Sequence, residues 1–256
     1  MKKEGVILDG ATYSGESSGR REGEEMKIFR ITERARDSLC RQAPEFRQIA
    51  AQTRLESFPC NTDLFLGLVQ SIVSQQLSVK VADVICQRLE TLLGKITAEN
   101  LLSATFEDLR SCGLSGRKIE YLRGIAEACE NGTVDFKSLA KKPDEEIIRE
   151  LVKLKGVGVW TAEMLLIFSL GRPDVLSYSD LGIRKGIMML NGLSSLTEEE
   201  FALYRKRYSP YGTLASLYLW RIKDGGLTVR TPEKQASAEK KRSEKKKTPS
   251  PTAKKR

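Results

Sequence analysis

Residues 150–170 read ELVKLKGVGVWTAEMLLIFSL, and this stretch predicts two helices joined by a tight turn. A segment of mixed polar and apolar residues runs to Lys155, the turn Gly156-Val157-Gly158 follows, and the remainder is almost wholly apolar. The glycines allow positive φ and close approach of another backbone, and the first amides of the second helix carry partial positive charge, so the turn can bind a phosphate. Most such turns are ordinary helix caps, however, and Thr161 stands where a dinucleotide-binding motif has its third glycine.

Length and composition exclude several classes of protein. The 256 residues are 40% hydrophobic, which is enough for one sizeable core or two small lobes. There is no histidine and the five cysteines form no CxxC pair, which argues against the usual zinc sites and against serine and cysteine triads. Acid–base chemistry would then fall to carboxylates, lysines or tyrosines. No apolar run reaches the roughly 18 residues of a membrane span, and reduced thiols in an intracellular protein are expected.

The positive charge is concentrated at one end of the chain. Residues 229–256 contain eleven Lys and Arg against three Asp and Glu, a net of +8 out of the total of +9. This basic tail is expected to be disordered, and it could attract nucleic acid, direct the protein to a compartment or simply keep it soluble. Residues 1–25, rich in Gly, Ser, Glu and Arg, are also expected to lack structure, which leaves 26–228 as the folded domain.

The folded part is predicted to be all-α, because helical periodicity recurs and no series of strands is apparent. One or two helices are expected between residues 26 and 53. Further helices are predicted at 63–73 with Thr62 or Asn61 as cap, and at 79–93, 97–102, 105–111, 116–131, 143–154, from the glycine turn to Gly171, and at 180–191, 197–208 and 211–223.

Three polar features in this series have both a structural and a functional interpretation. Asp180 is a good N-cap for the helix that follows it, or a catalytic acid. The Ser74–Ser78 segment, SQQLS, is a solvated elbow, or it projects an amide or Leu77 toward an opened duplex. The turn at 113–118, GLSGRK, is a simple helix start, or a second phosphate site with two cations.

Taken in order, these motifs resemble one family. IVSQQLS (72–78), GLSGRKIEYL (113–122), LKGVGVWTAEMLL (154–166), an Asp twenty positions after Trp160, and PYGTLASLYLW (210–220) are similar to the helix-hairpin-helix superfamily of DNA base-excision glycosylases. Within it, the 3-methyladenine DNA glycosylase II branch is the most similar. The resemblance covers roughly residues 27–224 and implies two helical lobes, a DNA-binding cleft between them, and a hairpin at about 144–170.

The resemblance also implies a role for each matching position. Asp180 would be the catalytic acid, and Gln76 or Leu77, with Gln75 beside them, would fill the gap left by an extruded base. A monovalent cation could bind the carbonyls of Val152, Leu154 and Val157 and bridge to the DNA. The remaining roles are DNA-backbone binding by Gly156, Val157, Gly158, Trp160 and Thr161, and a base pocket formed by Trp160, Tyr178, Tyr211 and Trp220.

Departures from related enzymes refine this expectation. Endonuclease III-type enzymes have a lysine where this chain has Trp160, so strand nicking through a Schiff base is not expected. No cysteine follows Cys129, so their iron–sulfur cluster is also missing. Gly212-Thr213 replaces the Arg-Ser of many relatives, and an additional N-terminal β-rich lobe has no room here.

The resulting hypothesis is a monofunctional glycosylase that excises alkylated purines such as 3-methyladenine and 7-methylguanine from double-stranded DNA. Such an enzyme would need no cofactor and no catalytic metal, would be monomeric and would not associate with a membrane. It is expected in the cytoplasm of a prokaryote or the nucleus of a eukaryote. The alternatives are a non-catalytic DNA clamp built on the same hairpin, and a glycosylase for oxidised or deaminated bases.

Overall fold

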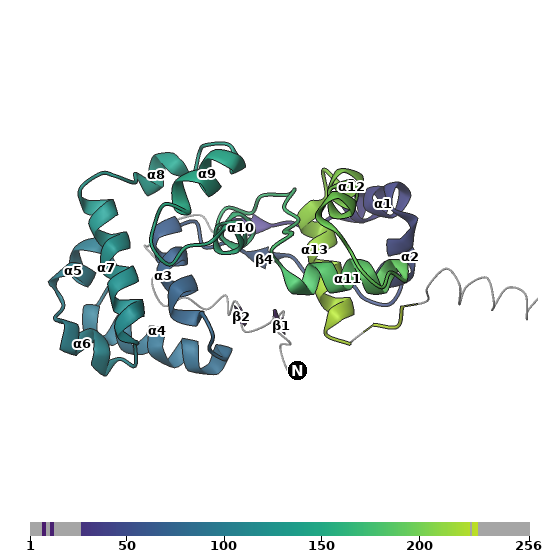
Figure 1. Ribbon diagram of the computed structural model, residues 1–256. Helices are drawn as coiled ribbons and strands as arrows, with labels where there is room; N and C mark the ends of the chain where they lie inside the picture. Colours follow the sequence, from purple (N-terminus) through teal and green to yellow (C-terminus); the bar gives the residue numbers. More distant parts are fainter. Residues whose placement is uncertain (1–6, 9–10, 13–26, 226, 230–256) are drawn as a thin grey trace, which may run out of the picture. The chain divides into compact units, whose positions relative to one another are not determined.

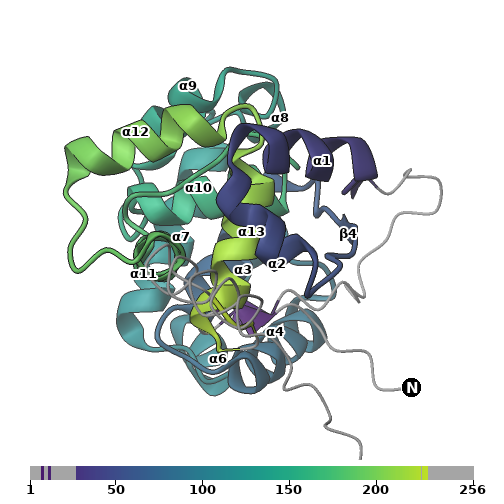
Figure 2. The same cartoon turned by 90° about the vertical axis from the view of Figure 1, so that its right-hand side faces the viewer.

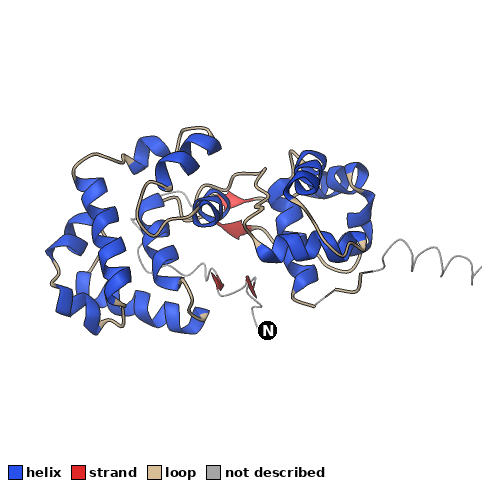
Figure 3. Cartoon of the chain, in the orientation of Figure 1, coloured by secondary structure: helices blue, strands red, loops and turns tan. Residues whose placement is uncertain are grey.

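The computed structural model describes residues 7–8, 11–12, 27–225 and 227–229 and is almost entirely helical in this part (Figure 1, Figure 3). The predicted all-α class is therefore confirmed. The chain divides into two compact units, one formed by Met1–Ile31 and Glu56–Ser179 and the other by Thr32–Leu55 and Asp180–Arg256. Among the described residues, no helix combines the length and the apolar character needed to cross a membrane.

The first unit contains eight helices in its described residues. They are α3 (Leu64–Ser74), α4 (Val79–Leu93), α5 (Ala98–Ser103), α6 (Phe106–Ser111), α7 (Gly116–Glu130), α8 (Phe136–Leu139), α9 (Asp144–Leu151) and α10 (Val159–Phe168). The apolar faces of α3 and α10 pack together, and α3 also contacts α4 and α7. Helix α10 is buried nearly all round, as its continuous apolar sequence predicts.

The second unit is built around α13 (Gly212–Lys223), whose middle is buried on every side. Its other elements are α1 (Glu33–Gln42), the 3-10 helix η1 (Pro44–Phe46), α2 (Arg47–Ala50), α11 (Leu181–Asn191) and α12 (Glu198–Tyr208). Helix α13 contacts α2, α11 and α12 (Figure 2). At the centre, the ring of Phe46 meets Tyr208 edge-on at 4.9 Å between centroids and lies 6.0 Å from Tyr218.

Four short strands were not predicted. β3 (Ile28–Phe29) pairs antiparallel with β4 (Phe58–Pro59), and the rings of Phe29 and Phe58 stack at 5.0 Å. The pair forms because the chain leaves the first unit after β3 and re-enters it at β4, a long-range constraint that local periodicity does not reveal.

β1 (Ile7–Leu8) pairs with β2 (Ala11–Thr12), so the expected lack of structure in 1–25 does not hold for these four residues. The other residues of 1–25 lie outside the described residues, as does the basic tail from residue 230 onward.

Several helix ends differ from the predictions for local reasons. Asp63, rather than Thr62 or Asn61, caps α3, with its carboxylate accepting from the amide of Leu66. Pro143 is the N-cap of α9 rather than its first residue, and α9 ends at Leu151, three residues early, because the hairpin turn begins there. Helix α4 spans the predicted residues, and α8 is a one-turn helix too short for a periodic signal.

Candidate DNA-binding hairpin and active site

The predicted helix, turn and helix are present as α9, residues 152–158 and α10. The turn closes where the amide of Val157 donates to the carbonyl of Leu154 at 3.1 Å. Gly156 has φ +89, and a Cβ there would lie 2.3 Å from Cδ2 of Tyr121. Backbone conformation and the ring of Tyr121 therefore both require glycine at this position.

The N-terminus of α10 is open in the way an anion site requires. Gly158 is its N-cap, and within the described residues no side chain caps this helix. A Cβ on Gly158 would meet no described atom within 4 Å, and Val159 beside it is 45% exposed. The first amides of a helix bind anions well because they lack carbonyl partners and lie at the positive end of the dipole.

The hairpin residues differ in what they can offer to DNA. The side chain of Thr161 is buried, so only its backbone amide could serve a phosphate, whereas Trp160 is half-buried. The carbonyl of Leu154 already accepts from Val157, but a carbonyl oxygen has a second lone pair for a cation. Cation binding by the carbonyls of Val152, Leu154 and Val157 stays a prediction. In the described part of the chain, no cluster of acidic or cysteine side chains could hold a metal ion.

Asp180 is the N-cap of α11, and its carboxylate accepts hydrogen bonds from two N–H groups. Its Oδ1 atom accepts from the amide of Ile183 at 2.8 Å, as an N-cap does, and from Nε1 of Trp220 at 3.1 Å. Asp180 as a whole residue is 8% exposed. Both donors belong to the same unit, so the position of this acid is fixed by packing between α11 and α13 as well as by its own helix.

Two glycines on α11 bring the indole within reach. A Cβ on Gly182 would lie 3.0 Å from Cδ1 of Trp220, and one on Gly186 would lie 2.6 Å from the carbonyl oxygen of Leu219. The two helices can approach this closely only because both positions lack side chains. The indole contact was not anticipated from sequence, although glycines four residues apart are a signal of close helix packing.

The expected base-pocket residues are divided between the units. Tyr211 and Trp220 lie in the second unit, which also contains the catalytic candidate Asp180, and Trp160 and Tyr178 lie in the first. Trp220 is only 5% exposed and its N–H serves the carboxylate, while the other three aromatic side chains are half-buried. The structure joins Trp220 to Asp180, and the base-contacting roles of the four aromatics stay predictions.

The SQQLS segment links α3 to α4 and has an unusual backbone. Gln76 has φ +59 and is the one non-glycine residue with positive φ in the described part of the chain. Its side chain is exposed, whereas Leu77 is half-buried. The Nε2 atom of Gln75 donates to the carbonyl of Gly156 at 3.1 Å, so this amide points to the hairpin.

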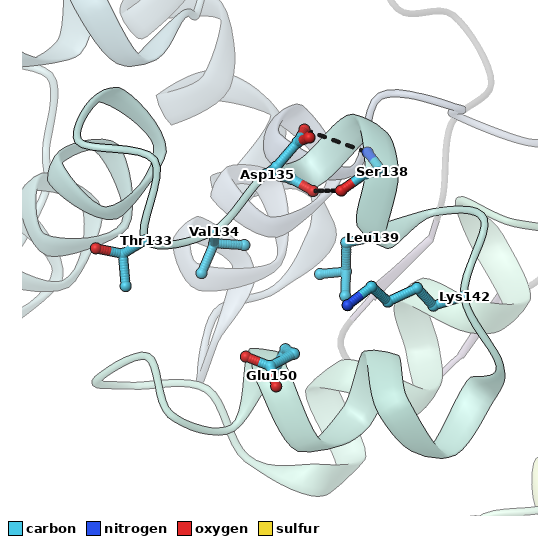
Figure 4. A pocket seen from close by; sticks show the side chains of 7 residues that line it. All are labelled: Thr133, Val134, Asp135, Ser138, Leu139, Lys142 and Glu150. Atoms are coloured by element: carbon cyan, nitrogen blue, oxygen red, sulfur yellow. Dashed lines mark hydrogen bonds between the residues drawn. The ribbon is translucent and has the colours of Figure 1, made fainter.

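A small polar pocket lies elsewhere in the first unit (Figure 4). Its lining residues are Thr133, Val134, Asp135, Ser138, Leu139, Lys142 and Glu150. Asp135 caps α8, and Glu150 pairs with Lys153 at 2.7 Å. These acids are committed to local structure, so the pocket is not a candidate for the chemistry.

Comparison with known proteins places the chain in a family. Residues 69–210 match the model of the HhH-GPD superfamily base excision DNA repair proteins. DNA-3-methyladenine glycosylase 1 of Schizosaccharomyces pombe is 39% identical over 159 residues, which cover 60% of this chain and 70% of that protein. DNA-3-methyladenine glycosylase of Saccharomyces cerevisiae is 34% identical over 181 residues, 67% of this chain and 61% of that protein.

Solved structures agree with the sequence relatives. A DNA-3-methyladenine glycosidase from Bacillus halodurans aligns with a TM-score of 0.70 at 35% identity, covering 83% of this chain and all of that one. S. pombe 3-methyladenine DNA glycosylase in complex with abasic DNA aligns with a TM-score of 0.65 at 32% identity, covering 75% of this chain and 97% of that one. The resemblance read from the motifs is confirmed, and the chain belongs to the HhH-GPD superfamily of base excision DNA repair proteins.

Proposed function

We propose that this chain is a monofunctional DNA glycosylase that hydrolyses the N-glycosyl bond of alkylated purines and leaves an abasic site. The observation that carries the proposal is the buried carboxylate of Asp180, held by Ile183 and Trp220, in a chain whose relatives are named 3-methyladenine glycosylases. A carboxylate in such a site can act electrostatically without histidine or metal.

The chemistry follows from the charge on the substrate. Alkylation at N3 or N7 makes a purine cationic, so the base departs with the electrons of its bond to C1′ and becomes neutral. Positive charge then develops on the sugar, and the negative charge of Asp180 stabilises it. Water attacks C1′, and its proton passes to Asp180 or to solvent. Aromatic faces would select the cationic base over a neutral one, since a desolvated cation on a ring gains about 2 kcal/mol.

DNA would be held by the hairpin while this chemistry proceeds. The uncapped first turn of α10 supports phosphate binding by amides from Gly156 to Thr161. Lys153 and Lys155 lie in the turn, 61% and 78% exposed, and pair with Glu150 and Glu120 at 2.7 and 3.7 Å. Each of these exposed ammonium groups would exchange its carboxylate for a DNA phosphate. One copy of the chain carries both the hairpin and Asp180, so we propose that it acts as a monomer wherever the cell keeps its DNA.

The decisive experiment compares wild-type protein with Asp180→Asn on alkylated duplex DNA. Asparagine can still accept from Ile183 and Trp220, so folding should persist while the charge is lost. We expect release of 3-methyladenine and 7-methylguanine to fall by about 10²-fold or more. Full release by Asp180→Asn would remove this acid from the mechanism, and no release by wild-type protein would favour the non-catalytic clamp.

Strand nicking provides a separate check. Trp160 occupies the position at which lyase-type enzymes have a lysine, so no amine is expected to form a Schiff base there. Borohydride treatment during turnover should therefore trap no protein–DNA adduct, and a trapped adduct would favour the lyase chemistry of oxidised-base enzymes.

A further inference from the structure

The loop between α3 and α4 is held in a conformation that costs free energy. Gln76 adopts φ +59, in the left-handed region that residues other than glycine rarely occupy because their Cβ is crowded there. Its neighbours in the loop are polar apart from half-buried Leu77. Such backbone persists only where surrounding contacts over-determine it, and these contacts can be identified here.

The first contact comes from Lys118 on α7. Its ammonium donates to the carbonyls of Val73 and Gln75 at 2.7 and 2.8 Å. The last carbonyls of a helix lack partners and lie at the negative end of its dipole, so a cation is the favoured group to bind them. Burial lowers the pKa of Lys118, and its ammonium points into the protein, so it is not the phosphate ligand that the GLSGRK turn suggested.

The second contact joins the loop to the hairpin. Nε2 of Gln75 donates to the carbonyl of Gly156, the residue at the bend of the phosphate-binding turn. The two glutamines therefore differ, since the Gln75 amide bonds to the hairpin and the Gln76 side chain is exposed.

We propose that Lys118 and Gln75 are positioning residues that preset the loop, so that Gln76 is presented as the plug at a fixed distance from the hairpin. The inference rests on the proposed function, since a plug is needed only if a base is extruded. A preset loop can replace lost stacking at once, whereas a loop that became ordered on binding would lose conformational entropy.

Lys118→Met tests this inference because methionine keeps most of the stem and removes the ammonium. Single-turnover release should be measured with 7-methylguanine paired within a duplex and with the same lesion in a bubble of unpaired bases. We expect about a tenfold loss on the paired substrate and less than about a twofold change in the bubble, where little stacking must be replaced. Lys95 is an exposed lysine just beyond the C-terminal end of α4, and Lys95→Met should match wild type on both substrates.

A double-mutant cycle separates positioning from general damage. Gln76→Gly removes the plug and tolerates positive φ, so adding Lys118→Met to it should cost much less than Lys118→Met costs alone. Equal losses on both substrates, or additive losses in the cycle, would reduce Lys118 to a structural role and overturn the inference. Gln75→Ala, which leaves no buried charge, should show the same selectivity for the paired substrate even if Lys118→Met folds poorly.

Affinity for a duplex with a synthetic abasic site tests the loop without catalysis. Lys118→Met and Gln76→Gly should both weaken binding at this vacancy relative to undamaged duplex, whereas Lys95→Met should not. If the wild-type protein releases no base but the variants show these differences in affinity, the proposed function alone is contradicted. Unchanged affinity in Lys118→Met contradicts the positioning role alone.

Discussion

At the scale of single residues, Asp180 illustrates how one carboxylate can cap its own helix and also bond a second one. Its Oδ1 atom accepts from the amide of Ile183, the bond that local sequence predicts, and also from the indole of Trp220. The second bond comes from a residue forty positions away and was not predicted. It changes the interpretation of Trp220, from an aromatic face toward a donor that orients the acid.

Trp220→Phe tests that interpretation, since phenylalanine keeps an aromatic ring and removes the N–H. A hydrogen bond to a charged group contributes about 1.5–3 kcal/mol, so we expect kcat to fall about 10- to 100-fold with little change in KM. Single-turnover release of 3-methyladenine measures this. If Trp220 acted only as a ring, the rate would be nearly retained.

Tyr218→Phe is the matched control on the same helix. The hydroxyl of Tyr218 is buried, and within the described residues it has no hydrogen-bond partner. Its removal should leave base release unchanged and should not lower the free energy of unfolding, because a buried unsatisfied hydroxyl is costly. A loss of activity equal to that of Trp220→Phe would show that both changes act through packing of α13.

At the scale of elements, the hairpin depends on two glycines that have different tasks. Gly156 is required by the fold, through its φ of +89 and the ring of Tyr121, whereas Gly158 faces open space. The first therefore fixes the turn and the second leaves the N-terminus of α10 accessible. This division separates effects on stability from effects on binding.

We predict that Gly156→Ala lowers the free energy of unfolding by about 2–4 kcal/mol, from left-handed strain and from the collision with Tyr121. Gly158→Ala should cost less than about 1 kcal/mol, since Gly158 has φ −98 and only its capping preference changes. Yet Gly158→Ala should weaken DNA binding, because its methyl group would lie where a phosphate approaches. Denaturant unfolding and DNA titration of both variants distinguish the two tasks, and normal affinity in Gly158→Ala would argue against phosphate binding here.

At the scale of the whole molecule, charge is separated from the helical part. The segment 229–256 has a net charge of +8 and 1–228 only +1. Removing residues 230–256 should therefore weaken undamaged-duplex binding and flatten the dependence of log K on log salt by several units, because fewer counterions are released. Base release at saturating DNA should be unaffected. An unchanged salt slope would leave the tail a role in targeting or solubility.

Local signals were sufficient for most of the helices and for the capping role of Asp180, whereas its catalytic role was proposed from the family resemblance. Caps and the 3.6-residue period act within about four residues, so α4, α11 and the hairpin could be read directly from the chain. The same signals failed where an end is set by a turn or by a distant strand, as at Leu151 and in the β3–β4 pair.

The sequence by itself therefore determined the helical class, the hairpin of two helices at about 144–170 and the placement of Asp180 at a helix start. Only the tertiary structure decided that the indole of Trp220 bonds this acid, that Tyr121 requires glycine at 156, and that Lys118 binds the carbonyls at the end of α3. The physical reason is the sequence separation of the contacting residues. Each contact depends on which helix faces pack together, and that packing is determined by many residues far apart in the chain.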